Sequence, residues 1–145
     1  MTVTLAELSR RTGLAVLEHL EREMAVPVVD GLQAQGDLLV VRLDVVARHV
    51  TVRDRWTEVP AAGLELLRGG AGGNPHTLVA DPGTCRWTNQ VEDRTGLALG
   101  ALRCTAPAYL IHPEHGATGI APGTHVIRRQ REHDHLLRRQ RLVAD

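Results

Sequence analysis

The fold is decided by the stretch Gln35–Leu43, which reads Gln-Gly-Asp-Leu-Leu-Val-Val-Arg-Leu. The hydrophobic pattern changes after Gly36, where leucine and valine follow one another directly and predict a β-strand over 38–43. The next segment, 49–53, alternates apolar and polar side chains and predicts a second strand. The chain from residue 33 onward is therefore expected to form a β-rich body.

Further strands are expected toward the C-terminus, wherever short apolar or alternating segments stand between glycine and proline turns. They are predicted at 64–67, 76–80, 85–88, 97–103, 108–112 and 124–129, with a last strand or short helix at 136–143. About seven or eight short strands divided by such turns are typical of small barrels and sandwiches. The predicted fold class is therefore mainly β, a small barrel or sandwich with one N-terminal amphipathic helix.

The N-terminal helix is predicted before Pro27. Thr4-Leu5-Ala6-Glu7 forms a capping box, in which the threonine side chain accepts a hydrogen bond from the N3 amide. A stripe at helical spacing follows, formed by Leu5, Leu8, Thr12, Val16, Leu20 and Met24. Gly13 weakens the middle of this helix, so a break at that residue stays open.

A helix-turn-helix is the other interpretation of this segment, in which the helix after Gly13 would enter a DNA groove. The outer face of that helix carries Glu18, Glu21 and Glu23, which repel phosphate. We therefore expect a helical segment at 1–26 that packs on the β-rich body at 33–145. Together they form a single domain, 1–145.

The composition argues against several classes of protein. The formal net charge of +0 argues against a general polyanion binder, although it leaves room for a local basic patch. Aromatic residues make up only 2%, too few for a platform that stacks single-stranded nucleic acid. Arginine provides every positive charge, and this lysine-free composition resembles that of actinobacterial proteins from GC-rich genomes.

The two cysteines, Cys85 and Cys104, fit neither a zinc-ribbon nor a redox CxxC spacing. They are expected to be reduced, buried thiols, with a bridge between neighbouring strands as the alternative. Residues 1–25 show no secretory pattern, and no apolar stretch reaches the ~20 residues that span a bilayer. The sequence therefore predicts a cytoplasmic protein without a membrane contact.

The most suggestive motif is His112-Pro113-Glu114-His115-Gly116. Its proline excludes a continuous helix, so the motif is not the helical zinc-protease arrangement. Two imidazoles at a strand end can converge, and a third, from His76, would complete a metal site with an open position. The predicted divalent-metal ligands are His76, His112 and His115, with Glu114 as general base or fourth ligand. The competing interpretation makes these histidines turn residues or hydrogen-bonding struts.

A glycine-rich loop, Gly69–Gly73, precedes the predicted strand that begins at His76. Its candidate site residues are Gly72, Gly73 and Asn74. The loop lacks the closing Lys-Ser/Thr of a phosphate-binding loop and leads into a strand rather than a helix. A hairpin loop is therefore the simpler interpretation, with phosphate binding as the alternative.

Arginines gather near the C-terminus and form a basic patch: Arg128, Arg129, Arg131, Arg138, Arg139 and Arg141. Alternation along a strand places Arg129 and Arg131 on one face and Arg128 on the other. Binding of RNA or DNA is one interpretation of the patch. A solvated strand edge that discourages aggregation is the simpler one.

Four elements stand in order within residues 33–135: Gln35–Val40, Gly73–His76, His112–Gly116 and Pro122–Glu132. The set resembles a group of small, uncharacterised bacterial and phage proteins with a QGD strand opening, a Gly-x-x-His element, a His-x-Glu-His element and a final GxYxVxxQRE strand. The chain departs from this pattern at Asn74, where many members carry histidine, and at His125, which replaces an aromatic residue.

This resemblance implies kinship rather than an activity. It also implies that His76, His112, Glu114 and the run Gln130-Arg131-Glu132 belong to one site. The candidate partner-binding residues are Arg128, Arg129, Gln130, Arg131 and Glu132.

Taken together, the neutral charge, the small size and the absence of a complete catalytic motif favour a non-enzymatic binding or assembly module of a bacterial or phage-derived multi-component system. The expected partner is another protein or a second copy of the chain. The first alternative is a metal-dependent small-barrel enzyme that uses His76, His112 and His115, although the chain lacks the His-x-His pair of cupins. The second alternative is nucleic-acid binding through the C-terminal arginine patch.

Overall fold

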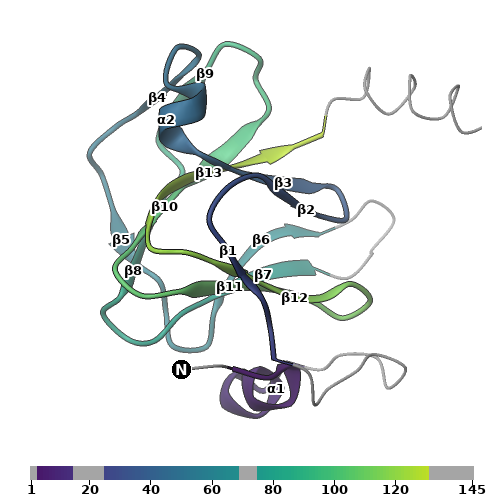
Figure 1. Cartoon of the computed structure of the whole chain (residues 1–145). Coiled ribbons are helices and arrows are strands. Elements are labelled where there is room, and N and C mark those ends of the chain that lie inside the picture. Colours follow the sequence, from purple (N-terminus) through teal and green to yellow (C-terminus); the bar gives the residue numbers. More distant parts are fainter. Residues whose placement is uncertain (1–2, 15–24, 69–74, 131–145) are drawn as a thin grey trace, which may run out of the picture.

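The computed structural model describes residues 3–14, 25–68 and 75–130, whose strands form two large sheets and a separate strand pair (Figure 1). The five-stranded sheet has the order β1 (Val28–Val29), β12 (Gly116–Ile120), β11 (Ala108–His112), β7 (Pro75–Val79) and β6 (Leu64–Arg68). The six-stranded sheet has the order β2 (Gln33–Gln35), β3 (Leu38–Arg42), β13 (Gly123–Arg129), β10 (Ala98–Cys104), β8 (Cys85–Thr88) and β5 (Thr57–Glu58). The remaining elements are β4 (Val50–Val52), which pairs with β9 (Val91–Asp93), and two helices, α1 (Leu5–Thr12) and α2 (Leu43–Val46).

The main core lies between the two large sheets, because residues of both sheets share one buried apolar cluster. Leu38, Leu102 and Ile127 come from the six-stranded sheet, and Leu78 and Leu110 come from the five-stranded sheet; all five are 0% exposed. The sheets stay separate in their pairing, so the arrangement is a sandwich rather than a closed barrel. The predicted mainly-β class is confirmed.

Each outer face of the sandwich has its own cover. α1 packs through Leu5 and Leu8 on the five-stranded sheet, where it meets Val79, Tyr109 and Ile111. The outer face of the six-stranded sheet is covered by α2 and β4, and the buried residues of that layer are Val41, Val46, Val50, Ala101 and Val126. The two sheets and their two covers therefore form four layers.

α1 begins as the capping box predicts, because the Thr4 side chain accepts a hydrogen bond from the Glu7 amide at 3.1 Å. The helix ends at Thr12, since Gly13 adopts a left-handed conformation with φ 73° and its amide donates to the Ser9 carbonyl. The break considered at Gly13 is therefore real. The rest of the predicted helical stripe, and the acidic face at 18–23, lies outside the described residues.

Most predicted strands are present within one or two residues of their expected bounds. Strands that the sequence did not predict are β1, β2, β5, β9 and β12, and α2 was also unexpected. β12 contains two glycines and resembles a loop in sequence. One of them, Gly119, is needed because a Cβ there would lie 2.8 Å from the Pro27 carbonyl oxygen, next to β1. The segments expected at 69–73 and 136–143 lie outside the described residues.

The cysteines lie opposite each other, where Cys85 in β8 pairs with Cys104 in β10. Both are free and buried. Burial raises the pKa of Cys85 to about 12 and also raises the pKa of Cys104, so both thiols stay protonated near neutral pH. Neither is therefore suited to act as a nucleophile.

No helix in the described ranges is long and apolar enough to cross a membrane.

Candidate functional site at the histidine corner

Segments that are far apart in sequence come together at one end of the sandwich. The β2–β3 turn, the start of β7, the β11–β12 turn and the end of β13 all lie at this end (Figure 1). They carry the four sequence elements that stand in order along the chain. We call this end the histidine corner, and define it by Gln35, Gly36, His76, His112, His115 and Gln130.

The pairing of β7 with β11 brings the first two histidines together. The two strands run antiparallel with Ile111 opposite Thr77, so the next step of the register sets His112 against His76. The centroids of these two rings are 4.5 Å apart. His115, in the β11–β12 turn, lies 4.4 Å from His112 and 6.3 Å from His76, again between ring centroids. The adjacency on which the three-histidine hypothesis depended is therefore present.

His112 holds the turn that follows it. Its Nδ1 atom accepts hydrogen bonds from the backbone amides of Glu114, at 3.0 Å, and His115, at 3.3 Å. Because an amide can only donate, Nδ1 carries a lone pair and the proton of the neutral ring lies on Nε2. The side chain is 6% exposed, so it is mainly a buried strut for the turn.

His76 is fixed by a buried amide. Gln35 donates from Nε2 to the Leu110 carbonyl at 2.8 Å, so its Oε1 atom is the acceptor for the His76 Nδ1–H at 3.0 Å. Burial above all, and then the neighbouring imidazoles of His112 and His115, together lower the pKa of His76 to about 4, while Asp37 opposes the shift. His76 is therefore neutral near pH 7, with the lone pair of its Nε2 atom unprotonated.

Gly36 allows the β2–β3 turn to approach the histidines. It has φ +56°, and a Cβ at this position would lie 2.9 Å from His115 Nε2 and 3.2 Å from His76 Cε1. The residue after β13 is hydrogen-bonded to the same turn. Gln130 donates from its side-chain Nε2 to the Gly36 carbonyl at 3.3 Å, and its backbone amide donates to the Asp37 carbonyl at 3.1 Å. The corner is therefore one continuous set of contacts.

The three histidines do not share the protonation pattern of metal ligands. A histidine that ligates through Nε2 usually donates its Nδ1–H to an oxygen. His76 has this arrangement, whereas His112 accepts at Nδ1. Within the described ranges, no group of three or more His, Cys, Asp or Glu residues is arranged to hold a metal ion. The site of His76, His112 and His115 stays a prediction, and it would require the turn to release His112.

The structure describes only some of the other predicted site residues. Glu114 is exposed on the β11–β12 turn. Arg128 donates to the Thr95 hydroxyl at 2.8 Å and lies beside Asp93. Its guanidinium is therefore engaged within the protein rather than free in a surface patch. Arg129 is exposed. Outside the described residues lie Gly72, Gly73, Asn74, Arg131, Glu132, Arg138, Arg139 and Arg141. Nucleic-acid binding by the arginine patch therefore stays a prediction from sequence.

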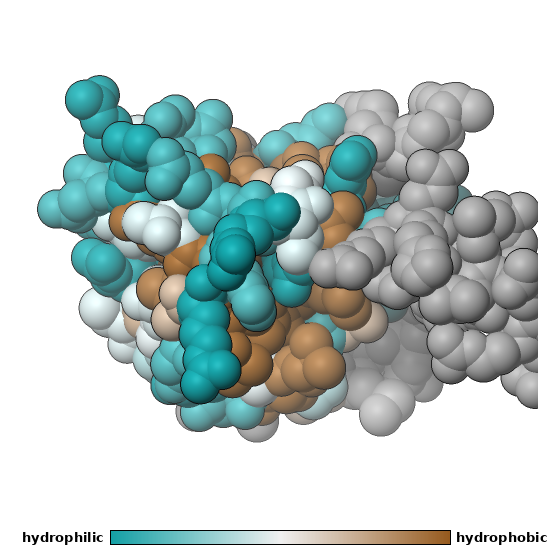
Figure 2. All heavy atoms as spheres, turned by 90° about the horizontal axis from the view of Figure 1, so that it is seen from above, coloured by the Kyte–Doolittle hydropathy of each residue, from teal (hydrophilic) through white to brown (hydrophobic). Residues whose placement is uncertain are grey.

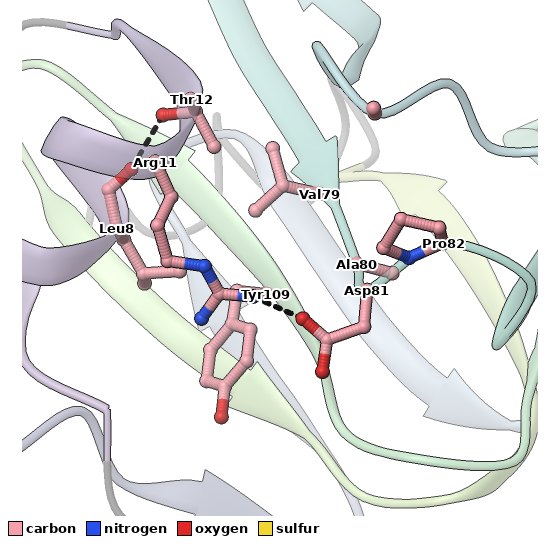
Figure 3. A pocket seen from close by; sticks show the side chains of 9 residues that line it. Leu8, Arg11, Thr12, Val79, Ala80, Asp81, Pro82 and Tyr109 are labelled. Atoms are coloured by element: carbon pink, nitrogen blue, oxygen red, sulfur yellow. Dashed lines mark hydrogen bonds and ion pairs between the residues drawn. The ribbon is translucent and has the colours of Figure 1, made fainter.

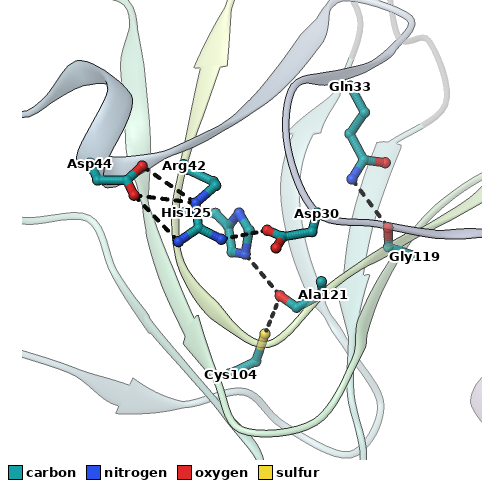
Figure 4. A network of polar contacts seen from close by, with 8 residues as sticks. All are labelled: Asp30, Gln33, Arg42, Asp44, Cys104, Gly119, Ala121 and His125. Carbon is teal, nitrogen blue, oxygen red and sulfur yellow. Dashed lines mark hydrogen bonds and ion pairs between the residues drawn. The ribbon is translucent and has the colours of Figure 1, made fainter.

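A second polar network, which sequence reasoning missed, lies where β3 ends (Figure 4). Arg42 forms ion pairs with Asp30 and Asp44. Its strand neighbour His125 is 0% exposed and donates from Nε2 to the Ala121 carbonyl at 2.8 Å. This network joins the end of β3 to the loop between β1 and β2, and it is separate from the histidine corner.

Gln35 is the functional residue that sequence reasoning missed at the corner itself. Beside Gly36 and Asp37 it resembles an ordinary turn residue, yet its side chain is 4% exposed and joins three strands. The only signal that could have found it was its place in the Gln-Gly-Asp opening, which the resemblance had already marked.

The fold and site define a two-sheet β protein with a histidine-lined corner. Residues 34–130 match the family model described as Domain of unknown function (DUF8820), and the chain belongs to this family. The match covers about two thirds of the chain and contains every residue of the histidine corner, whereas α1 and β1 lie outside it. No curated protein and no solved structure matches the chain.

Proposed function

We propose that this protein is a non-enzymatic binding or assembly module that holds a partner protein, or a second copy of itself, at the histidine corner. The observation that supports this is the convergence of four separate segments there. Two of the three histidines are held in fixed contacts there: His112 accepts from the backbone of the β11–β12 turn, and the His76 side chain is hydrogen-bonded to the Gln35 side chain. The corner is therefore built to hold loops in a defined shape, which is what a recognition surface requires.

The groups that face solvent at the corner suit a protein partner. Asp37, Glu114 and His115 are exposed, so the surface offers both acidic and imidazole groups rather than one sign of charge. A net charge of +0 also favours a protein surface over a polyanion. Protein interfaces of this kind combine apolar contacts with a polar rim.

Apolar side chains are available close to this surface in the sequence. Hydrophobic residues reach the surface between hydrophilic ones (Figure 2). The large hydrophobic side chains exposed in the described ranges are Val28 at 44%, Leu32 at 71% and Val45 at 70%. Val28 and Leu32 belong to the segment that leads directly into β2 and the Gln35–Asp37 turn. Their continuity with this turn makes them candidates for the apolar part of the proposed interface.

A matched pair of charge reversals tests the proposal. Asp37→Arg changes the corner, and Asp54→Arg makes the same change at an exposed residue between β4 and β5. Cross-linking and co-purification from the native cells, with light scattering to measure self-association, should show the partner lost in Asp37→Arg and kept in Asp54→Arg. Equal behaviour of the two variants would contradict binding at the corner.

Metal binding is a second candidate, favoured by the environment of His76. Its Nδ1–H is held by an oxygen and its Nε2 lone pair is unprotonated, which is how a metal-ligating histidine is normally oriented. Metal analysis of untagged protein should then find a stoichiometric divalent metal that is lost in His76→Ala and in a His112→Ala/His115→Ala double variant. His49→Ala, at an exposed residue elsewhere, is the control. A metal-free protein with unchanged folding would exclude this candidate.

A further inference from the structure

A pocket lies between α1 and the outer face of the five-stranded sheet, away from the histidine corner (Figure 3). Leu8 anchors the helix on this sheet, against Val79 and Tyr109. One turn later along α1, Arg11 and Thr12 line the pocket together with Asp81 and Pro82, which follow β7. The pocket is therefore enclosed by the helix on one side and by the sheet on the other.

The pocket has a volume of about 270 Å³. An engineered protein cavity of roughly 150 Å³ stays dry and binds benzene, so this volume is enough for one substituted ring or a short branched chain. Its apolar wall consists of Leu8, Ala61, Val79, Ala80, Pro82 and the ring of Tyr109. Alanine and proline are too small to fill the space themselves.

The mouth of the pocket carries a neutral pair of opposite charges. Arg11 extends from α1 to form an ion pair with Asp81, and the Tyr109 ring lies beside this pair (Figure 3). The side chains of Arg11 and Asp81 are 46% and 56% exposed, so both can also form hydrogen bonds with a ligand. The guanidinium has donors beyond the one that Asp81 uses, and the carboxylate has a second oxygen.

A charged head group would be repelled by one member of this pair. A carboxylate would be repelled by Asp81, and an ammonium group would be repelled by Arg11. A head group that donates to Asp81 and accepts from Arg11 satisfies both without breaking the ion pair. A primary amide has this combination of donor and acceptor.

We propose that this pocket binds a small uncharged molecule that has an apolar ring or branched chain and one head group able to donate and accept hydrogen bonds. Such a site is independent of the proposed binding function at the histidine corner. It combines an apolar cavity with a small number of placed polar groups, as small-molecule sites generally do.

Three probes of similar size test the head group: benzamide, benzoate and benzylammonium. Titration of the ¹⁵N-labelled full chain, followed by amide shifts around Val79 and Tyr109, should show benzamide binding at least fivefold tighter than either charged probe. Equal binding of all three, or no shift at about 10 mM benzamide, would overturn the proposal.

Filling the pocket provides the positional test. Ala61→Phe should weaken benzamide binding at least tenfold, because Ala61 lines the pocket. Ala62→Phe places the same ring at the neighbouring exposed residue, which does not line it, and should leave binding unchanged. Equal binding by the two variants would assign the ligand to another surface and overturn the proposal.

The ion pair gives a test that does not depend on filling the space. Asp81→Asn removes the ion-pair partner of Arg11 and should shift the preference toward benzoate. Arg11→Met leaves Asp81 unopposed and should reverse the preference toward benzylammonium. The Leu8 amide shift reports whether α1 stays on the sheet in both variants. An unchanged order of the three probes, with α1 in place, would overturn the role of the pair.

Discussion

His76 and Gln35 are joined by a buried hydrogen bond of 3.0 Å that crosses from the five-stranded sheet to the six-stranded sheet. Gln35 also donates to the Leu110 carbonyl, so its single side chain connects β2 with both β7 and β11. Gln35 itself is the last residue of β2, directly before the β2–β3 turn of the corner. The stability of the sandwich and the shape of the site therefore share this residue.

Replacement of Gln35 by leucine should lower the free energy of unfolding by about 2–4 kcal/mol. The substitution leaves the His76 Nδ1–H without its acceptor, which costs about 1–3 kcal/mol, and removes the hydrogen bond to the Leu110 carbonyl, which contributes about 1 kcal/mol. Urea unfolding monitored by circular dichroism measures this loss. Gln90→Leu, at an exposed glutamine, should change the unfolding free energy by less than about 0.5 kcal/mol.

Acidification should destabilise the protein through His76. Its pKa is lowered from 6.5 to about 4 in the folded state. Between these values the unfolded chain binds more protons than the folded chain, so stability is full above pH 6.5 and falls as pH falls toward about 4. The loss amounts to about 3 kcal/mol at most.

The measurement compares urea unfolding at about pH 7.5 and about pH 4.5 in the wild type and in His76→Gln. The variant removes the titrating ring, so it should lose less stability over this interval. An equal loss in both proteins would mean that other groups cause the pH dependence.

The turn after β11 should depend on the acceptor at residue 112. His112→Ala removes the atom that accepts from the Glu114 and His115 amides and should cost about 1–3 kcal/mol. His112→Asn should recover part of this loss, because a short amide side chain can accept from the backbone two residues later. Hydrogen exchange at the two amides checks the prediction: it should accelerate in His112→Ala and less in His112→Asn.

Gly36 and Gly96 allow backbone strain to be separated from a close contact. Both have positive φ, +56° and +72°, but a Cβ at Gly36 meets His115 and His76, whereas a Cβ at Gly96 meets nothing within 4 Å. Gly96→Ala should therefore cost only the conformational term, about 1 kcal/mol. Gly36→Ala should cost more and should also shift the ring resonances of His115 and His76. Equal costs with unshifted rings would contradict the close approach.

The sequence predicted strands wherever an apolar run was long enough to show a strand pattern. Leu38–Arg42 and Ala108–His112 are such runs, and both lie close to their predicted bounds. β1 and β5 have two residues each, too few for a period to be seen. Their position follows from pairing with β12 and β8, which is a tertiary relationship.

The candidate site was predictable in its residues but not in its chemistry. The motif around His112 and the position of His76 marked side chains that the fold brings together. Which nitrogen of His112 carries the proton depends on the amides of the following turn, and no residue pattern shows this. Gln35 escaped prediction because a glutamine before a glycine gives no sign that it will be buried.

The hydrogen bond between Gln130 and Gly36 spans 94 positions of the chain. It closes the histidine corner with residues from the two ends of the family segment. Contacts of such long range form late, because the entropy of closing a large loop must be overcome before they contribute. The proposed recognition at the corner should therefore appear only in the final step of folding, and a nascent chain that has not yet released β13 should be unable to engage the proposed partner there.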